Sequence, residues 1–170
     1  MQTKDSGGLT FEKSFTLTVN DQQEINMEHL TREWTQLLGS SDWDSGLSIT
    51  TADDGSIYIT GSVRGDLDGQ TNSGEEDVFI SKFNSDGSKQ WTQLLGSADY
   101  DSGNSISTAD DGSIYITGVT RGDLDGQTNG GSGDVFISKF NSDGSKQWTQ
   151  VLGSSDYETG KSISIADDGS

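Results

Sequence analysis

Short runs in which apolar and polar residues alternate, separated by glycine-containing turns, recur along most of this chain. In the clearest run, Ile57 and Ile59 alternate with Tyr58 and Thr60. Alternation at every second position is typical of β-strands. Asp-Gly steps between the runs favour tight hairpins, because glycine accepts a positive φ and aspartate caps the turn. The pattern predicts four successive strands, over residues 47–52, 56–63, 77–83 and 88–95.

The four runs return with a fixed period of 57 residues. Segment 34–90 is followed at Trp91 by a second copy that is identical at 48 of the 57 positions. A third copy begins at Trp148 and shares 17 of its 23 residues with the second. Such self-similarity indicates one structural unit per copy, with each unit stacked on the next.

Several predicted strands carry apolar side chains on both faces, as in Val78-Phe79-Ile80. A sheet that is covered on both sides explains this pattern, whereas a one-sided sheet would alternate strictly. Four antiparallel strands per unit, stacked face to face, predict the blades of a β-propeller. We therefore expect an all-β fold: a partial β-propeller with four-stranded antiparallel blades and a 57-residue repeat.

The residues before the repeat follow a different pattern. Phe15, Leu17 and Val19 alternate with serine and threonine, which predicts one half-buried strand from about residue 11 to residue 20. A single strand cannot form a sheet by itself, so we interpret residues 1–21 as the end of a truncated domain.

A polar stretch over 22–33 separates this strand from the repeat, and we interpret it as a linker. It holds His29, the one histidine of the chain, which has no evident partner for a functional role. The repeat region is then 34–170, with units that start at Trp34, Trp91 and Trp148.

Composition excludes several classes of function. The formal net charge of -18 argues against nucleic acid and anionic membrane surfaces, and favours divalent cations or plain solubility. No cysteine is present, so a disulfide framework and a thiolate metal site are both excluded. No run of 18 apolar residues predicts a transmembrane helix. The first residues lack the pattern of a signal peptide, so we expect any export signal to lie outside this chain.

The repeat carries spaced motifs that point to a known family. In the second copy they are Trp91, Leu95-Gly96, Asp110-Asp111-Gly112-Ser113-Ile114-Tyr115-Ile116-Thr117-Gly118, Gly122-Asp123-Leu124-Asp125-Gly126, Asp134-Val135-Phe136-Ile137-Ser138-Lys139-Phe140 and Gly144. These motifs resemble the bacterial beta-propeller repeat of the SBBP type, and the resemblance spans residues 34–170. It implies blades of a seven-bladed propeller in a large secreted or cell-surface protein, often beside cadherin-like or other adhesive modules.

Residues 7–21 resemble the last strand of bacterial cadherin-like domains. The resemblance implies that this strand closes an immunoglobulin-like sandwich, and that acidic and asparagine residues just after it bind calcium. Gln22 and Gln23 depart from the family pattern at the expected calcium ligands.

The repeat boundaries lead to two further expectations. Segment 32–39 corresponds to a fourth strand without the preceding three, so we expect it to complete a blade whose other strands lie beyond this chain. The chain holds about two blades and the first strand of a third, whereas propellers close with about four to eight blades. We therefore expect a fragment that forms an open arc with exposed edges, prone to association with other chains.

The acidic loop of each repeat is the candidate metal site. Oxygen ligands at alternate positions, followed by a carboxylate about eleven residues after the first, suit a hard cation such as calcium. The candidate ligands are Asp66, Asp68, Asn72, Asp77, Asp123, Asp125, Asn129 and Asp134. The spacing departs from an EF-hand loop, and the alternative interpretation is that these residues cap turns and keep the loop soluble.

Other repeated residues have both a structural and a functional interpretation. The triplets at 53–55, 110–112 and 167–169 read Asp-Asp-Gly and predict hairpin turns. Trp34, Trp91 and Trp148 predict core packing between blades, with sugar stacking as the alternative. Trp43, Tyr100 and Tyr157 share one repeat position in an acidic loop, so we expect them to be exposed, with carbohydrate contact as the alternative. We interpret Asp42, Asp44, Asp99 and Asp101 as loop carboxylates, which could instead line one propeller face.

A catalytic function has little support. The repeats contain neither cysteine nor histidine, and near-identical copies give each blade the same carboxylates, whereas an active site needs unlike groups in one place. We expect a non-catalytic repeat scaffold of a secreted or cell-surface protein. In one form of this hypothesis, calcium bound in the acidic loops stabilises the scaffold. It would act in adhesion or bind a protein or carbohydrate ligand through its blade loops. The alternative is a fragment of a carbohydrate-active propeller enzyme whose catalytic blade lies outside this chain.

Overall fold

The computed structural model describes residues 3–4, 10–11 and 34–166. The chain divides into two compact units, 1–32 and 33–170. In the first unit, β1 (Thr3–Lys4) pairs antiparallel with β2 (Thr10–Phe11). The predicted strand over 11–20 and the predicted linker over 22–33 lie outside the described residues, apart from Phe11.

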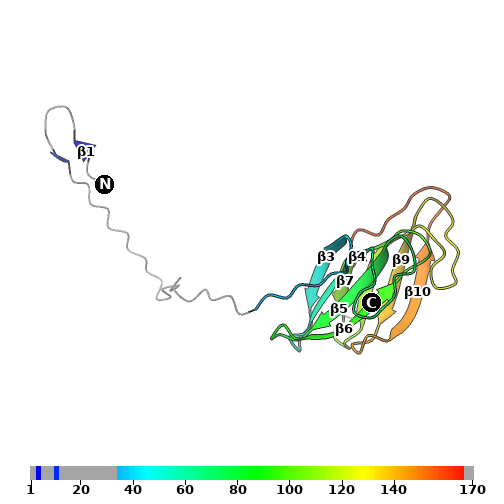
Figure 1. Cartoon of the computed structure of the whole chain (residues 1–170), viewed down its shortest axis with the longest axis horizontal. Coiled ribbons are helices and arrows are strands. Elements are labelled where there is room, and N and C mark those ends of the chain that lie inside the picture. The colour runs from blue at the N-terminus through cyan, green and yellow to red at the C-terminus, as the bar shows by residue number, and fades with distance from the viewer. Residues whose placement is uncertain (1–2, 5–9, 12–33, 167–170) are drawn as a thin grey trace. The chain divides into compact units, whose positions relative to one another are not determined.

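The second unit contains two four-stranded antiparallel sheets, which confirm the predicted all-β, partial-propeller fold (Figure 1). The first sheet, blade 1, has the strands β3 (Asp44–Thr51), β4 (Ile57–Val63), β5 (Asp77–Phe83) and β6 (Lys89–Leu95). The second sheet, blade 2, has the strands β7 (Asp101–Thr108), β8 (Ile114–Thr120), β9 (Asp134–Phe140) and β10 (Lys146–Leu152). Each strand pairs with the next one in sequence, as a blade requires. Among the described residues, no helix has the length and apolar character that crossing a membrane requires.

The Asp-Asp-Gly triplets at 53–55 and 110–112 form hairpin turns, as predicted, and the triplet at 167–169 lies outside the described residues. Gly55 has a φ of 79°, and its N–H donates to the carbonyl of Ala52 over 2.9 Å. Oδ1 of Asp54 accepts the N–H of Ser56 over 2.8 Å, and this contact lowers the pKa of Asp54. Glycine tolerates the positive φ, and the aspartate satisfies a backbone donor in the turn.

The core of the molecule lies between the two blades. Tyr58, Val78 and Ile80 of blade 1 pack in one buried cluster with residues of blade 2 that include Ile106 and Ile114. Burial of an aliphatic or aromatic side chain of this size stabilises the fold by about 1.5–3 kcal/mol. This packing explains why the strands carry apolar residues on both faces.

Trp91 packs against this cluster, which confirms the predicted packing role for the second tryptophan of the repeat. Its Nε1 donates to the carbonyl of Ser142 over 3.2 Å, and its ring lies 6.1 Å from that of Tyr58. Trp148 has the same place in blade 2 but is 40% exposed, because no blade covers it among the described residues.

The prediction of a strand over 32–39 is wrong for the residues that the structure describes. Residues 34–40 run beside blade 1 without strand structure, because no neighbouring strand pairs with their backbone. Trp34 nevertheless donates from Nε1 to the carbonyl of Ser85 over 3.1 Å, the contact that Trp91 makes with Ser142.

The expected first strand of a third blade is likewise not formed among residues 159–166. This segment still contacts blade 2, since the N–H of Gly160 donates to the carbonyl of Gly118 over 2.9 Å. The N–H of Ile163 donates to Oγ of Ser105 over 3.2 Å, just as that of Ile106 donates to Oγ of Ser48. Both flanking segments therefore lie where a strand of a neighbouring blade would lie.

Candidate functional site at the loop end of the blades

The two ends of each blade differ in their connections. One end carries only tight hairpin turns, such as those at Gly55 and Gly87. The other end carries the long acidic loop between the second and third strands, 64–76 in blade 1, and the 96–100 connection between the blades. Because loops at one end of a rigid scaffold commonly carry function, this loop end is the candidate site.

A serine and a carboxylate hold each connection between blades. In the connection from blade 1 to blade 2, the N–H and Oγ of Ser97 both donate to Oδ2 of Asp101, the latter over 2.7 Å. Oγ of Ser97 also accepts the N–H of Asp99 over 3.1 Å. The same pattern recurs in the pairs Ser40–Asp44 and Ser154–Glu158. This repeated turn fixes the backbone next to the aromatic residue of each connection.

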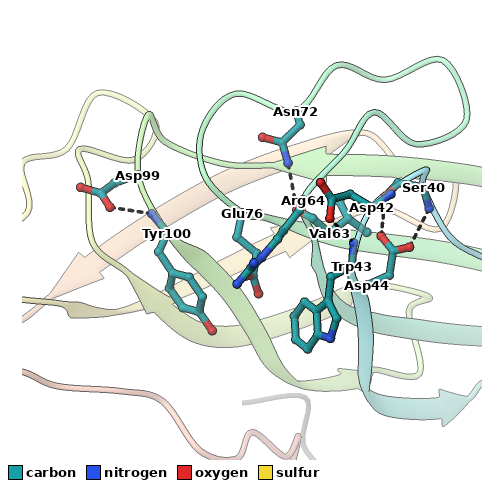
Figure 2. A network of polar contacts seen from close by, with 10 residues as sticks. All are labelled: Ser40, Asp42, Trp43, Asp44, Val63, Arg64, Asn72, Glu76, Asp99 and Tyr100. Carbon is teal, nitrogen blue, oxygen red and sulfur yellow. Dashed lines mark hydrogen bonds and ion pairs between the residues drawn. The ribbon is translucent and has the colours of Figure 1, made fainter.

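The aromatic residues of these turns form a row with two arginines, which we call the aromatic row: Trp43, Arg64, Tyr100, Arg121 and Tyr157. The Arg64 guanidinium lies 5.3 Å from the ring centre of Trp43 (Figure 2). The Arg121 guanidinium lies 4.9 Å from the ring centre of Tyr100 and 5.8 Å from that of Tyr157. Cations over aromatic faces at these distances attract the ring quadrupole.

The exposure of the row is close to the expectation from the sequence. Trp43 and Tyr157 are 52% and 51% exposed, which confirms the prediction for them. Tyr100 is half-buried, and Arg121 lies across its ring. The row therefore offers aromatic faces and guanidinium donors on the surface.

The two arginines differ in whether a carboxylate forms an ion pair with them. Nε of Arg64 donates to Oε2 of Glu76 over 3.2 Å, and Glu76 is 1% exposed (Figure 2). Gly133 stands at the Glu76 position of the second repeat, and among the described residues no carboxylate lies within ion-pair distance of Arg121. The ring of Tyr157 packs over Gly133, where a Cβ would approach ring atoms to 2.9 Å. Arg121 thus keeps its hydrogen-bond donors available on the surface.

The predicted metal ligands serve hydrogen bonds and ion pairs within the protein. Oδ1 of Asp66 accepts the N–H of Asn72 over 2.9 Å, and Asn72 Nδ2 donates to the carbonyl of Val63 over 2.8 Å. Asp68, with a φ of 52°, forms an ion pair with Lys89. The equivalent contacts in blade 2 are made by Asp123, Asn129, Asp125 and Lys146.

Asp77 and Asp134, the last residues of the proposed ligand sets, begin β5 and β9 and are buried. Within the described part of the chain, no group of three or more acidic or histidine side chains is placed to hold a metal ion. These contacts support the turn-capping interpretation, and calcium binding stays a prediction.

Two buried carboxylates meet at the junction of the blades. Asp77 and Asp101 are both 0% exposed. The interpretation of Asp44 and Asp101 as loop carboxylates is wrong, because they begin β3 and β7. Oδ2 of Asp77 accepts the N–H of Ser73 over 2.8 Å, but Oδ1 of Asp77 and Oδ1 of Asp101 have no hydrogen-bond partner among the described residues. Burial raises the pKa of Asp77. Burial also raises the pKa of Asp101, and the negative charge of Asp77 raises the pKa of Asp101 further.

A concavity also exists at the hairpin end. It has a volume of about 440 Å³ between the turns of the two blades, and its lining includes Asp53, Asp54, Asp110 and Asp111. Asp54 and Asp111 already cap the N–H groups of Ser56 and Ser113. These turn contacts explain the presence of Asp54 and Asp111, and no ligand is needed to explain them.

The sequence interpretation did not include the two arginines or the buried acid pair. Arg64 and Arg121 follow the second strand of each repeat at a fixed position, which is the signal that could have found them. Asp77 begins the third strand of one blade and Asp101 the first strand of the next, so strand periodicity alone does not show that both are buried near each other.

Comparisons with known proteins support the repeat family. Residues 90–125, which run from β6 into the acidic loop of blade 2, match the family described as Beta-propeller repeat (SBBP). The chain is 30% identical over 145 residues to "Regulatory protein FlaEY" of Caulobacter vibrioides (strain ATCC 19089 / CIP 103742 / CB 15). That similarity covers 79% of this chain, and the chain spans 15% of the relative's length. The cadherin-like strand stays a prediction.

We expect acidification to stabilise the wild-type chain relative to an Asp101→Asn variant. A carboxyl with a raised pKa in the folded state binds a proton there before the unfolded chain does. The stability that this carboxyl contributes is therefore fully present below its pKa in the unfolded chain, about 3.9. It is lost as the pH rises through the pKa of the folded state. Urea unfolding of both proteins between about pH 7 and pH 3 measures the difference.

Asp86→Asn is the control of opposite sign. Hydrogen bonds from Ser88 lower the pKa of Asp86, so the stability that this carboxylate contributes is present above the unfolded value and is lost as the pH falls through the folded value. A difference between wild type and Asp101→Asn that does not change with pH would contradict the assigned burial effect.

Calcium provides a second test at this end of the blades. Because the loop carboxylates already have partners, we expect equal Tm values in millimolar calcium and in chelator. A ligand that binds only the folded state must raise its stability. A Tm increase that disappears when Asp66, Asp68, Asp123 and Asp125 are changed to asparagine would establish calcium sites and contradict the turn-capping interpretation.

Proposed function

We propose that this chain is a non-catalytic propeller scaffold that binds its ligand through the aromatic row at the loop end of the blades. The observation that carries the proposal is that the same group of surface side chains recurs at each blade connection. An exposed or half-buried aromatic ring stands beside an aspartate in all three, and two of the rings have their own arginine. A few polar groups around aromatic faces are typical of ligand sites.

The chemistry of the unit favours a carbohydrate chain as the ligand. Aromatic faces stack on the C–H faces of sugar rings, and carboxylates and guanidinium groups hydrogen-bond to hydroxyl groups. Asp42 and Asp99 each use Oδ1 for the N–H of the following aromatic residue, and both side chains are exposed. Their Oδ2 atoms therefore have space to accept hydroxyl donors.

The repetition of the unit favours a polymer. Three similar sites in one row would each bind one segment of a chain of repeating sugars, and linked weak sites increase the overall affinity. The net charge of -18 disfavours an anionic polysaccharide, so a neutral one fits best.

This proposal includes a setting for the protein. The repeats resemble those of large secreted or surface proteins that often carry adhesive modules beside them, and this leads us to propose a secreted or cell-surface location and a role in adhesion. That step rests on family analogy, since a fold alone does not define a function. The relative's name describes a regulatory protein, and no role is transferred from it, since this chain spans 15% of its length.

Retention on insoluble neutral polysaccharides tests the proposal. The full chain is passed over cellulose, chitin, β-glucan and mannan, and we expect retention on at least one of them. The Trp43→Ala, Tyr100→Ala, Tyr157→Ala triple variant should lose at least about tenfold in affinity, which corresponds to about 1.4 kcal/mol.

The matched control is Trp148→Ala, which removes a tryptophan of 40% exposure that lies outside the row. We expect this variant to bind as the wild type does. Equal binding of wild type and triple variant would contradict the role of the row. Absence of retention on all four polymers would contradict a neutral glycan ligand and would favour a protein partner, for which Trp, Tyr and Arg are also common anchors.

A further inference from the structure

The two blades present the same arginine in the same backbone setting. Arg64 and Arg121 directly follow the second strand of their blades. The backbone N–H of Arg64 donates to the carbonyl of Trp43 over 3.1 Å, and that of Arg121 donates to the carbonyl of Tyr100 over 2.9 Å. Each guanidinium lies over the ring of the same aromatic residue. Blade 1 therefore provides an internal comparison for blade 2.

The difference between the two arginines arises at one position of the long loop, Glu76 in blade 1 and Gly133 in blade 2. The backbone at this position is held alike in both blades. The carbonyl of Glu76 accepts the N–H of Asp101 over 2.7 Å, and the carbonyl of Gly133 accepts that of Glu158 over 2.7 Å. Only the side chain differs, and Oε2 of Glu76 lies 3.2 Å from Nε of Arg64 (Figure 2).

Arg121 lacks such a partner. Among the described residues, no carboxylate lies within ion-pair distance of its guanidinium. The side chain is exposed and lies between the rings of Tyr100 and Tyr157. The rings attract its positive charge, but they supply no oxygen acceptor for its five N–H groups. These donors are therefore directed to solvent or to a ligand.

A neighbouring blade does not cover this position. Blade 2 packs against blade 1, yet the side chain of Arg64 remains 53% exposed. The connection that follows blade 2, residues 153–158 with Tyr157, belongs to the described part of the chain. Arg121 lacks an ion pair because its own loop has Gly133 in place of a glutamate, and not because of the place of blade 2 in the chain.

We propose that Arg121 makes blade 2 a subsite for an N-acetylated sugar, with its guanidinium donating to the carbonyl oxygen of the acetamido group. This inference rests on the proposed function of the aromatic row. A hydrogen bond from a charged donor is about twice as strong as one between neutral groups. An amide carbonyl is also a stronger acceptor than a sugar hydroxyl. The guanidinium without a carboxylate therefore gains most from the acetamido group.

The charge of the whole chain favours this neutral acceptor over a carboxylate. A polymer with one carboxylate on each sugar would be repelled by the net charge of -18. An acetamido group offers a strong acceptor without adding charge, and its methyl group is suited to an aromatic face such as Tyr157. In blade 1, Glu76 already neutralises Arg64, so that site has no comparable preference. The ligand class is then a neutral polymer of N-acetylated amino sugars.

Calorimetric titration of the full chain with matched sugar hexamers tests the inference. The β-1,4-linked hexamers of N-acetylglucosamine and of glucose differ only at C2, which carries an acetamido group in one and a hydroxyl in the other. We expect the wild type to bind the N-acetylglucosamine hexamer at least about tenfold more tightly. A hexamer of galacturonic acid provides the anionic comparison, and we expect it to bind more weakly than the N-acetylglucosamine hexamer.

Two variants assign this preference to Arg121. Arg121→Gln removes the charge and the paired donors at an exposed position, and Gly133→Glu gives Arg121 the carboxylate that Arg64 has. In both, we expect the glucose and N-acetylglucosamine hexamers to bind with affinities within about threefold of each other. Because a Cβ at Gly133 would displace the ring of Tyr157, Arg121→Gln is the decisive variant. Arg64→Gln is the matched control and should keep the preference of the wild type.

The outcomes separate this inference from the proposed function. Equal binding of the glucose and N-acetylglucosamine hexamers, or a preference that Arg121→Gln retains, would overturn this inference and leave glycan binding by the aromatic row in place. Tighter binding of the galacturonic acid hexamer would also overturn it, in favour of an anionic ligand. Binding of none of the hexamers would overturn it as well, and retention on the four insoluble polymers then decides the proposed function independently.

Discussion

Each sheet of this protein depends on a neighbour that covers its apolar faces. A four-stranded blade has strands with apolar side chains on both sides, and only stacking removes both sides from water. Between β3 and β7 the sequence changes little, yet Ile49 is 64% exposed and Ile106 is 5% exposed. The difference comes from blade 1, which lies against this face of β7, so cover by a neighbouring repeat is the constraint on which the rest depends.

The same stacking positions the candidate site. A blade connection must turn within a few residues, and a serine with a carboxylate four residues later holds that turn in each repeat. The turn brings an aromatic ring to the end of the next blade, beside the arginine that follows the second strand. Repetition of the fold therefore produces repetition of the surface, and a row of similar sites follows from the stack.

Local pattern predicted the elements whose ends are marked in the sequence. The strand over 77–83 has the predicted bounds, because the Asn-Ser-Asp-Gly turn follows it directly. The strand predicted over 47–52 begins earlier, at Asp44, since Ser45 and Gly46 pair with Ser62 and Gly61 without any alternation that would indicate it. The strand predicted over 32–39 was wrong for the described residues 34–39, because a strand requires a pairing partner, which sequence periodicity does not supply. Burial of Asp101 beside Asp77, and the stacking of Arg64 on Trp43, depend on residues about twenty positions apart, so neither could be predicted locally.

Amide hydrogen exchange tests the dependence on cover most directly, measured by mass spectrometry at the lowest usable protein concentration. β3 and β7 have nearly the same sequence and the same pairing, and they contact each other. They differ in the face that carries Ile49 or Ile106: blade 1 covers this face of β7, whereas among the described residues no blade covers it on β3. The account predicts that the amides of Ser105–Thr108 exchange much more slowly than those of Ser48–Thr51. Equal protection of the two strands would show that each blade is stable by itself, and it would contradict the claim that stacking holds the sheets together.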